Sequence, residues 1–193
     1  MGLFNPAWFR QLADNACELL FGDDEVEQPQ PAFNATPPDS RFCADDPVLV
    51  AWASQTGTAE AFSDEAIRWL HASGLSAVDM PFDTLELAVL ESASQALFIV
   101  STSYDGDPPD MAEAFSDTVM KQPADLQQLR YGLLALGDRC YADFCGFGHQ
   151  LHDWLQASHA RAWFDPVEVD DEDPAALQCW RDRVGALLTA TSD

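Results

Sequence analysis

A run of hydroxyl-bearing residues with one glycine follows the first predicted strand of the chain. It reads SQTGTAE, and its candidate ligand contacts are Ser54, Gln55, Thr56, Gly57, Thr58 and Ala59. Hydroxyls and backbone N–H groups at a helix N-terminus bind a phosphate without a basic side chain. The glycine lets the backbone approach the anion closely. Neither the GxxxxGK motif nor GxGxxG occurs in the sequence. The run therefore predicts a site for a ligand that ends in one phosphate; a structural helix cap is the alternative.

A second loop combines hydroxyls, an aromatic ring and acidic residues. It reads STSYDGDPP, and its candidate contacts are Thr102, Ser103, Tyr104, Asp105 and Gly106. The tyrosine lies where a strand gives way to a helix, so its ring can stack on a planar ligand. We expect Asp107 to cap the following helix, with Pro108 at its first position.

A third loop, LGDRCYADFC, brings two more aromatic rings. Its candidate contacts are Leu136, Gly137, Asp138, Tyr141, Phe144 and Cys145. Each aromatic side chain alone is also explained by ordinary packing. A phosphate loop together with two aromatic loops is better explained by a planar ligand that carries a phosphate.

Alternating strands and helices must position these loops. Short apolar runs predict strands at residues 48–53, 75–80, 96–100, 131–136 and 162–164, the last with a longer form that continues to 169. Helical spacing predicts helices after Thr58, at 85–90, at 108–120, around 147–155 and after Pro174. This order implies an α/β fold of three layers, with a doubly wound, five-stranded parallel sheet covered on both faces. The three loops then meet at the edge where such sheets bind ligands.

The first 46 residues read differently from the rest. Apolar residues at helical spacing predict an amphipathic helix at 6–21, and an acidic, proline-rich linker follows it up to residue 46. We expect the helix either to dock on its own domain or to bind a partner. The main domain is expected at residues 47–193.

Composition limits the partners and the compartment. The chain has 33 acidic against 9 basic residues, for a formal net charge of -24, which excludes nucleic acid and favours basic partner proteins. Acidity that only keeps the protein in solution is the alternative. Five cysteines without a CxxC pair predict a cytoplasmic location, and no apolar run is long enough for a membrane span. His149 and His152 lack a third ligand, so no metal site is expected.

The three loops resemble those of the FMN-binding flavodoxin domain of the diflavin reductases, such as cytochrome P450 reductase and the sulfite reductase flavoprotein. SQTGTAE is similar to that family's phosphate loop without change, and the resemblance covers about residues 47–190. It implies the strand order 2-1-3-4-5, FMN as the cofactor, and Tyr141 against one face of the flavin ring. It also places Asp170 near the family's last acidic contact. Ser103 stands where many relatives have a stacking tyrosine, and Tyr104 stands where they have glycine. Either Tyr104 stacks from one place further along, or the one-electron-reduced form of the flavin is less stabilised.

The same resemblance implies an electron carrier with no catalytic residue of its own. The sequence ends without the FAD and NADPH modules of the diflavin enzymes, so we expect an NAD(P)H-dependent flavin reductase to supply electrons. We expect an acceptor protein to take them. Two alternatives stay open: a flavin-free interaction module, and a small FMN-dependent reductase of quinones or nitro compounds.

Overall fold

The central element of the protein is a parallel β-sheet. The structure is a computed structural model that describes residues 42–190. The strands of the described part are β1 (Val48–Ala53), β2 (Ala77–Pro81), β3 (Gln95–Ser101), β4 (Arg130–Gly137), β5 (Arg161–Ala162) and β6 (Val167–Asp170). They follow the order β2-β1-β3-β4-β5, with β6 also paired to β4, and every pair is parallel. The predicted doubly wound sheet and its order are confirmed.

The fifth position in the sheet is filled by two short strands rather than one. Tyr131 of β4 pairs with Ala162 of β5, whereas Leu134 of β4 pairs with Val167 of β6. The chain therefore advances five residues from β5 to β6 while β4 advances three. Pro166 lies in the interruption and has no N–H to give to the ladder. The predicted single strand is therefore split.

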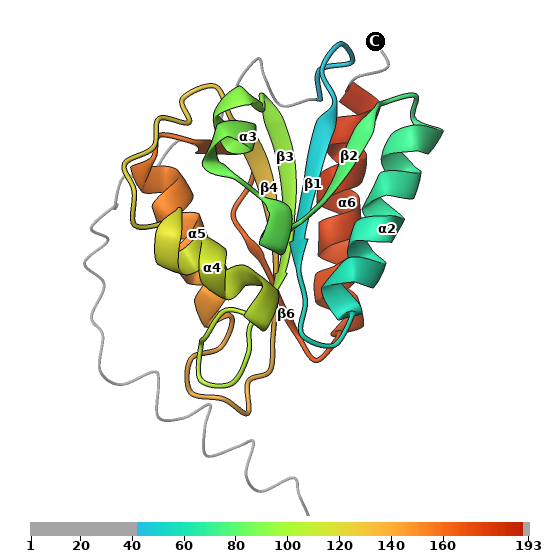
Figure 1. Ribbon diagram of the computed structural model, residues 1–193. Coiled ribbons are helices and arrows are strands. Elements are labelled where there is room, and N and C mark those ends of the chain that lie inside the picture. Colours follow the sequence, from blue (N-terminus) through green and yellow to red (C-terminus); the bar gives the residue numbers. More distant parts are fainter. Residues whose placement is uncertain (1–41, 191–193) are drawn as a thin grey trace, which may run out of the picture. The chain divides into compact units, whose positions relative to one another are not determined.

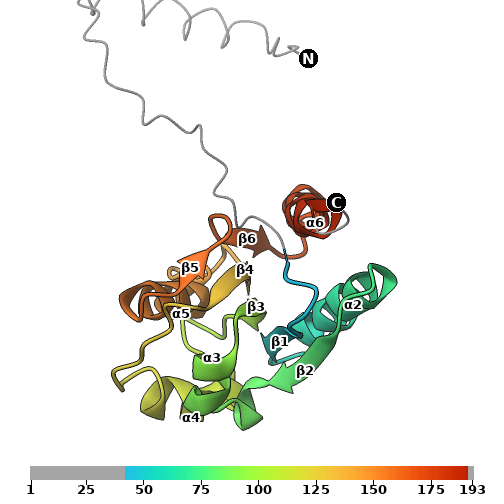
Figure 2. The same ribbon diagram turned by 90° about the horizontal axis from the view of Figure 1, so that it is seen from above.

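Helices cover both faces of this sheet (Figures 1 and 2). They are α2 (Thr58–Ala72), the 3-10 turn η1 (Phe82–Thr84), α3 (Leu87–Ser92), α4 (Asp110–Thr118), α5 (Gly146–Ala157) and α6 (Pro174–Ala190). Helices α2 and α6 lie on one face, and α3, α4 and α5 lie on the other. Each face has its own apolar core: Phe98, Phe115 and Leu151 belong to one, and Ile99 and Trp180 to the other.

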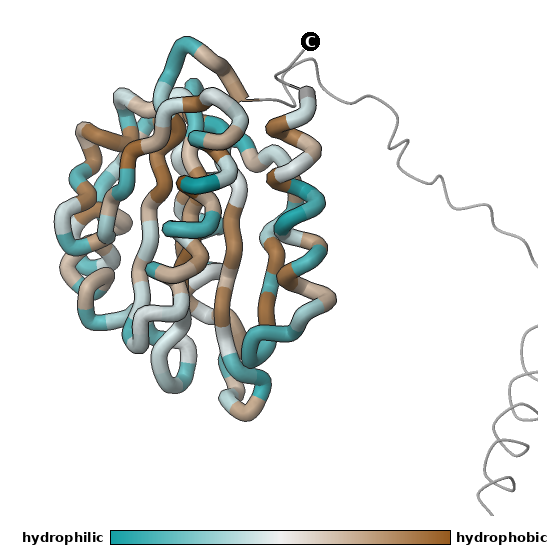
Figure 3. Tube along the Cα trace, turned by 90° about the vertical axis from the view of Figure 1, so that its right-hand side faces the viewer, coloured by the Kyte–Doolittle hydropathy of each residue, from teal (hydrophilic) through white to brown (hydrophobic). Residues whose placement is uncertain are grey.

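The burial of the strands explains why they read as continuous apolar runs. All residues of β3 except the last are buried, and so are the central six of β4. Figure 3 shows the same contrast as brown strands between helices that alternate brown and teal. A strand buried on both faces is mostly apolar along its whole length, which is typical of parallel sheets. No helix of residues 42–190 is long and apolar enough to cross a membrane.

Helix α4 begins later than its sequence predicts. Pro109 precedes its first residue, Asp110, and no side chain caps it, so the predicted cap at Asp107 is wrong. The backbone of Asp107 exchanges two hydrogen bonds with that of Ser103, of 2.8 and 2.9 Å, which hold it in an extended conformation. Pro109 also disfavours a helical conformation at Pro108.

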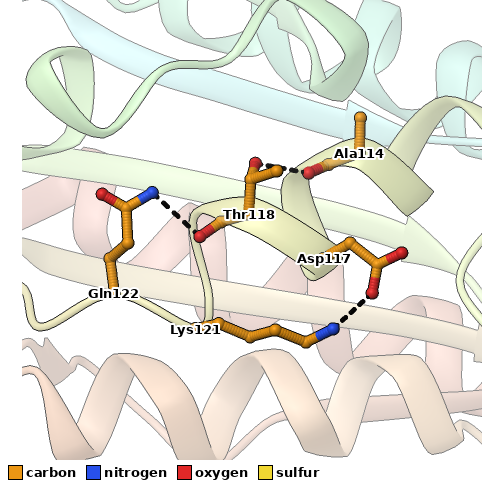
Figure 4. A network of polar contacts seen from close by, with 5 residues as sticks. All are labelled: Ala114, Asp117, Thr118, Lys121 and Gln122. Carbon is orange, nitrogen blue, oxygen red and sulfur yellow. Dashed lines mark hydrogen bonds and ion pairs between the residues drawn. The ribbon is translucent and has the colours of Figure 1, made fainter.

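The C-terminal end of α4 is completed by side chains (Figure 4). The Thr118 hydroxyl donates to the Ala114 carbonyl at 2.6 Å, and the Gln122 amide donates to the Thr118 carbonyl at 2.9 Å. Lys121 pairs with Asp117 one turn earlier. The Gln122 bond supplies a donor to the Thr118 carbonyl at the helix end, where intrahelical partners run out.

A short segment before β1 is fixed to the sheet by one glutamine. The buried Gln95 side chain accepts the Cys43 N–H at 2.8 Å and donates to the carbonyls of Cys43 and Asp46 at 2.9 and 2.6 Å. Phe42 is buried and packs edge-on against Trp163. The predicted N-terminal helix at 6–21 lies outside the described residues, and a domain boundary at 46 stays a prediction.

Replacing Gln95 by alanine is expected to destabilise the domain. The change leaves one backbone N–H and two carbonyls without their partner, which costs about 1–3 kcal/mol of unfolding free energy. Urea unfolding of the variant measures this loss. Gln128→Ala, which removes one exposed bond to the Glu91 carbonyl, is the control and should lose less than about 0.5 kcal/mol. Equal unfolding midpoints for both variants would contradict the role given to Gln95.

Candidate cofactor site

A cavity of about 360 Å³ opens at the carboxyl ends of β1, β3 and β4. Nine of its lining residues are predicted contacts: Thr56, Thr58, Thr102, Tyr104, Leu136, Gly137, Asp138, Tyr141 and Cys145. Nine other predicted contacts do not line it: Ser54, Gln55, Gly57, Ala59, Ser103, Asp105, Gly106, Phe144 and Asp170. The site prediction missed five lining residues: Ser101, Asp143, Val169, Asp171 and Glu172. For Asp171 and Glu172, the only signal in the sequence was the acidic run at residues 170–173.

The first loop turns around its own serine. The Ser54 hydroxyl accepts the N–H groups of Gly57 and Ala59 at 2.9 and 3.2 Å. Gly57 has φ 92°, in the left-handed region that favours glycine, and precedes α2. The hydroxyls of Thr56 and Thr58 lie 3.4 Å apart. Ser54 thus shapes the loop from inside, while the two threonines line the cavity.

Donors are available at the start of α2. The backbone N–H groups of Gln55, Thr56 and Thr58 form no hydrogen bond with another residue of the described segment 42–190. The Gln55 side chain points elsewhere, because it exchanges two bonds with Asp110, of 3.2 and 3.1 Å. Unpaired N–H groups beside two hydroxyls at a helix N-terminus are suited to an anion.

The second loop is tightly folded. The Ser103–Asp107 bridge closes it, Tyr104 has φ 44° and Gly106 has φ 101°. Tyr104 lines the cavity but is 73% exposed, so its ring is not packed into the protein. A tyrosine in the left-handed region is strained, and such positions cluster at binding sites.

Two hydroxyls of this loop are buried without a partner. Within the described residues, neither Thr102 Oγ1 nor Ser103 Oγ has a hydrogen-bonding partner. Ser103 is 8% exposed, and Thr102 lines the cavity. A buried hydroxyl without a partner costs free energy, which a polar ligand recovers.

The third loop is held by its own polar groups. The Asp138 carboxylate accepts the Cys140 N–H at 2.7 Å, and the Asp138 carbonyl accepts the Tyr141 N–H at 3.1 Å. The Tyr141 side chain lines the cavity and is 45% exposed. The buried Cys145 thiol donates to the Ala135 carbonyl at 3.3 Å, and burial raises the pKa of Cys145 to about 12. That thiol is therefore neutral at pH 7 and inert.

The second and third loops touch through glycines. A Cβ added at Gly146 would lie 2.6 Å from Gly106 Cα, and one added at Gly106 would collide with the Asp143 carboxylate. A Cβ at Gly137 would lie 2.8 Å from the Cys145 backbone nitrogen. Only glycine allows these close approaches, so the two loops form one wall of the site.

Negative charge dominates the cavity. Four carboxylates line it, from Asp138, Asp143, Asp171 and Glu172, and no lysine or arginine does. No cluster of potential metal ligands occurs in residues 42–190. His149 pairs with Glu168 at 2.7 Å and His152 with the Tyr131 hydroxyl at 2.9 Å, so both serve packing and surface contacts.

Comparison with known proteins defines the class. The flavodoxin family matches residues 50–180. The sulfite reductase flavoprotein alpha-component of Neisseria meningitidis serogroup C is 29% identical over 142 residues, which cover 73% of this chain and 24% of the relative. The NADPH–cytochrome P450 reductase of Bos taurus is 31% identical over 130 residues, 65% of this chain and 19% of the relative. The chain thus spans about a fifth to a quarter of the length of these relatives.

Solved structures agree with the fold. A C101S mutant of a Pseudomonas aeruginosa flavodoxin is 25% identical, with a TM-score of 0.64 over 76% of this chain and 99% of that chain. A Streptococcus pneumoniae flavodoxin, 21% identical, has the same TM-score over 74% and 98%. This chain belongs to the flavodoxin family.

Family membership makes FMN the cofactor, and the site fits it. The cavity lies within the range of about 300–1,000 Å³ of ligand pockets. The free N–H groups and hydroxyls at the start of α2 suit its phosphate. The buried hydroxyl of Thr102 and the ring of Tyr141, which both line the cavity, suit a polar, planar ring system.

Gly106→Ala is expected to disturb the site and the fold together. The new Cβ meets the Asp143 carboxylate, and the left-handed backbone is strained for alanine, so the change should cost at least about 1–3 kcal/mol of unfolding free energy. Thermal unfolding and FMN titration measure the two effects. Gly185→Ala is the matched control, because Gly185 lies in α6 with open space around it. It should gain about 0.5–1 kcal/mol. A Gly106 variant as stable as the parent would contradict the close packing of the loops.

Proposed function

We propose that this flavodoxin-family chain carries single electrons on FMN between a separate reductase and an acceptor protein. The observation that supports it best is the cavity at the carboxyl ends of the strands, with a lysine-free hydroxyl loop beside exposed tyrosines. When bound, FMN supplies the redox chemistry. The protein binds it, orients it and sets the charge around it.

The phosphate of FMN binds at the start of α2. Thr56 and Thr58 donate their hydroxyls to it, together with the unpaired backbone N–H groups of the loop. The loop contains no basic side chain, so neutral donors and the positive end of the helix dipole neutralise the charge. Ser54 keeps the loop in shape rather than binding the anion alone.

The ring system lies between the second and third loops. Tyr141 covers one of its faces, and the Thr102 hydroxyl donates or accepts a hydrogen bond at its polar edge. Tyr104 flanks the exposed edge, where its ring remains largely in solvent. Ser103 has no aromatic ring to stack, so Tyr141 supplies the aromatic cover and Tyr104 only flanks the edge.

Thr56→Ala combined with Thr58→Ala is expected to weaken FMN binding by a few kcal/mol, because each charge-assisted hydrogen bond contributes roughly 1.5–3 kcal/mol. Titration of cofactor-free protein with FMN, followed by fluorescence, measures the loss. Thr84→Ala with Thr118→Ala, two exposed threonines that bond only to nearby groups of the chain, is the control. Unchanged FMN affinity in the Thr56/Thr58 double variant would place the phosphate elsewhere.

The redox partners are basic proteins that dock on the acidic edge around the cavity. Asp105 and Asp107 are exposed on the second loop, and the exposed Glu172 lines the cavity. Complementary charge raises association rates at low salt more than it raises affinity. The electron donor is an NAD(P)H-dependent flavin reductase, and the four described cysteines, all free, agree with a cytoplasmic location.

Neutralising Asp105, Asp107 and Glu172 to Asn, Asn and Gln should slow electron transfer to cytochrome c, a basic one-electron acceptor. We expect the bimolecular rate at low salt to fall roughly tenfold and its salt dependence to flatten. Stopped-flow mixing of chemically reduced, FMN-loaded protein measures it. The control neutralises Asp83, Glu86 and Glu91, which are all exposed and lie in or next to η1 and α3. Equal loss in both variants would mean that only net charge matters.

A small FMN-dependent reductase of quinones or nitro compounds is the second candidate. The exposed Tyr104 favours it, because a ring that is 73% exposed leaves room for a small acceptor at the cavity. Oxidation of NADPH by the purified, FMN-loaded chain with a quinone, and no other protein, would support this reading. A chain that takes up no FMN would instead be an interaction module.

A further inference from the structure

Asp170 does not line the cavity, yet it makes two contacts with the loop that carries Tyr141. One carboxylate oxygen accepts the backbone N–H of Arg139 at 2.9 Å. The other lies 3.6 Å from Nε of the same arginine. One carboxylate therefore fixes both the main chain and the side chain of a single loop residue.

The arginine carries this attachment across the loop. Its guanidinium carbon lies 4.7 Å from the centre of the Phe144 ring. Arg139 precedes Tyr141 and Phe144 follows it, so the contacts of Arg139 tie both ends of the segment that holds the tyrosine. A guanidinium over an aromatic ring is a cation–π contact, which arginine forms more often than lysine.

The strand beneath the loop gives Asp170 a fixed position. Asp170 is the last residue of β6 and pairs with Gly137 of β4. The backbone N–H of the next residue, Asp171, donates to the Gly137 carbonyl at 3.1 Å. The Asp170 side chain is 38% exposed against 69% for Arg139. The carboxylate is thus the less exposed partner and sits on a paired strand, so we take the arginine as the group that it restrains.

We propose that Asp170, Arg139 and Phe144 form a latch that holds the third loop, so that Tyr141 is already placed for the FMN ring before the cofactor binds. Asp170 is then a positioning residue and not a contact of the cofactor. The inference rests on the proposed function for its FMN contact, but the state of the loop can be measured without FMN.

The latch is made of exposed charges, so its effect is modest and depends on salt. Such contacts change an equilibrium by roughly two- to tenfold. Holding a loop in its bound conformation strengthens binding by removing the cost of ordering it. We therefore expect FMN affinity to fall by that factor when the latch is broken, and the difference between the variant and the parent to shrink at high salt.

The test compares Asp170→Ala with Asp165→Asn in the full chain. Asp165 is an exposed carboxylate between β5 and β6 with no ion pair among the described residues, so its variant controls for lost charge in the same segment. Amide hydrogen exchange of residues 138–145 without FMN reports the loop, and titration with FMN reports binding. We expect faster exchange and two- to tenfold weaker binding for Asp170→Ala only.

A double-mutant cycle separates the latch from independent effects. Arg139→Ala should lose less FMN affinity than Asp170→Ala, because it breaks the ion pair and keeps the bond from the backbone N–H of residue 139 to Asp170. The combined variant should lose less than the product of the two single losses, because both changes break the same ion pair. Arg139→Lys should restore only part of the affinity, since lysine keeps the charge and loses the stacking on Phe144.

Three results would overturn the latch. They are parent-like exchange of residues 138–145 in Asp170→Ala, additive losses in the cycle, and faster exchange with unchanged FMN affinity. A parent chain that does not bind FMN would contradict the proposed function instead. FMN binding by the parent chain is therefore measured before any variant is compared.

Discussion

The parallel hydrogen-bond ladder between β1, β3 and β4 is the interaction on which the site depends. It pairs Ala53 with Val100, and Ser101 with Leu136, so the three strands end at nearly the same level. Each of the three loops starts from that level, which is why residues separated by about eighty positions in the chain share one cavity. A shift of register would move one loop along the sheet and break the cavity without changing any loop residue. The apolar cores on both faces protect this register, because slipping would drag buried side chains out of them.

The loops themselves are fixed by short-range contacts rather than by apolar burial. Ser54 organises the first, the Ser103–Asp107 bridge closes the second, and Asp138 folds the third. Glycines then let the second and third meet. The binding groups left over are neutral hydroxyls, N–H groups and rings, surrounded by carboxylates. A site of this kind holds a bound anion through dipoles, which suits a protein whose own charge is strongly negative.

Much of this arrangement could be predicted from the sequence, because strands buried on both faces and a hydroxyl loop before a helix have strong local signatures. The strand order came from the likeness of three loops to a known family, since periodicity is the same for any order of parallel strands. Asp107 was misplaced as a helix cap because its backbone bonds with Ser103 depend on a loop closure that has no sequence signature. Asp143 and Val169 were missed as lining residues for a related reason: their place follows from how β6 and the third loop pack, not from their type. The contacts assigned to individual residues remain predictions.

The division of the last sheet position into β5 and β6 has a consequence for the protein in a crowded solution. An unbroken strand at the edge of a sheet offers a row of free N–H and C=O groups to any other chain, and is a common start of aggregation. Here that edge is two residues of β5, an interruption that contains Pro166, and four residues of β6. The opposite edge strand, β2, ends in Pro81 and carries the exposed Asp79. Neither edge presents a long, uncharged strand, so a second copy has no regular template on which to extend the sheet.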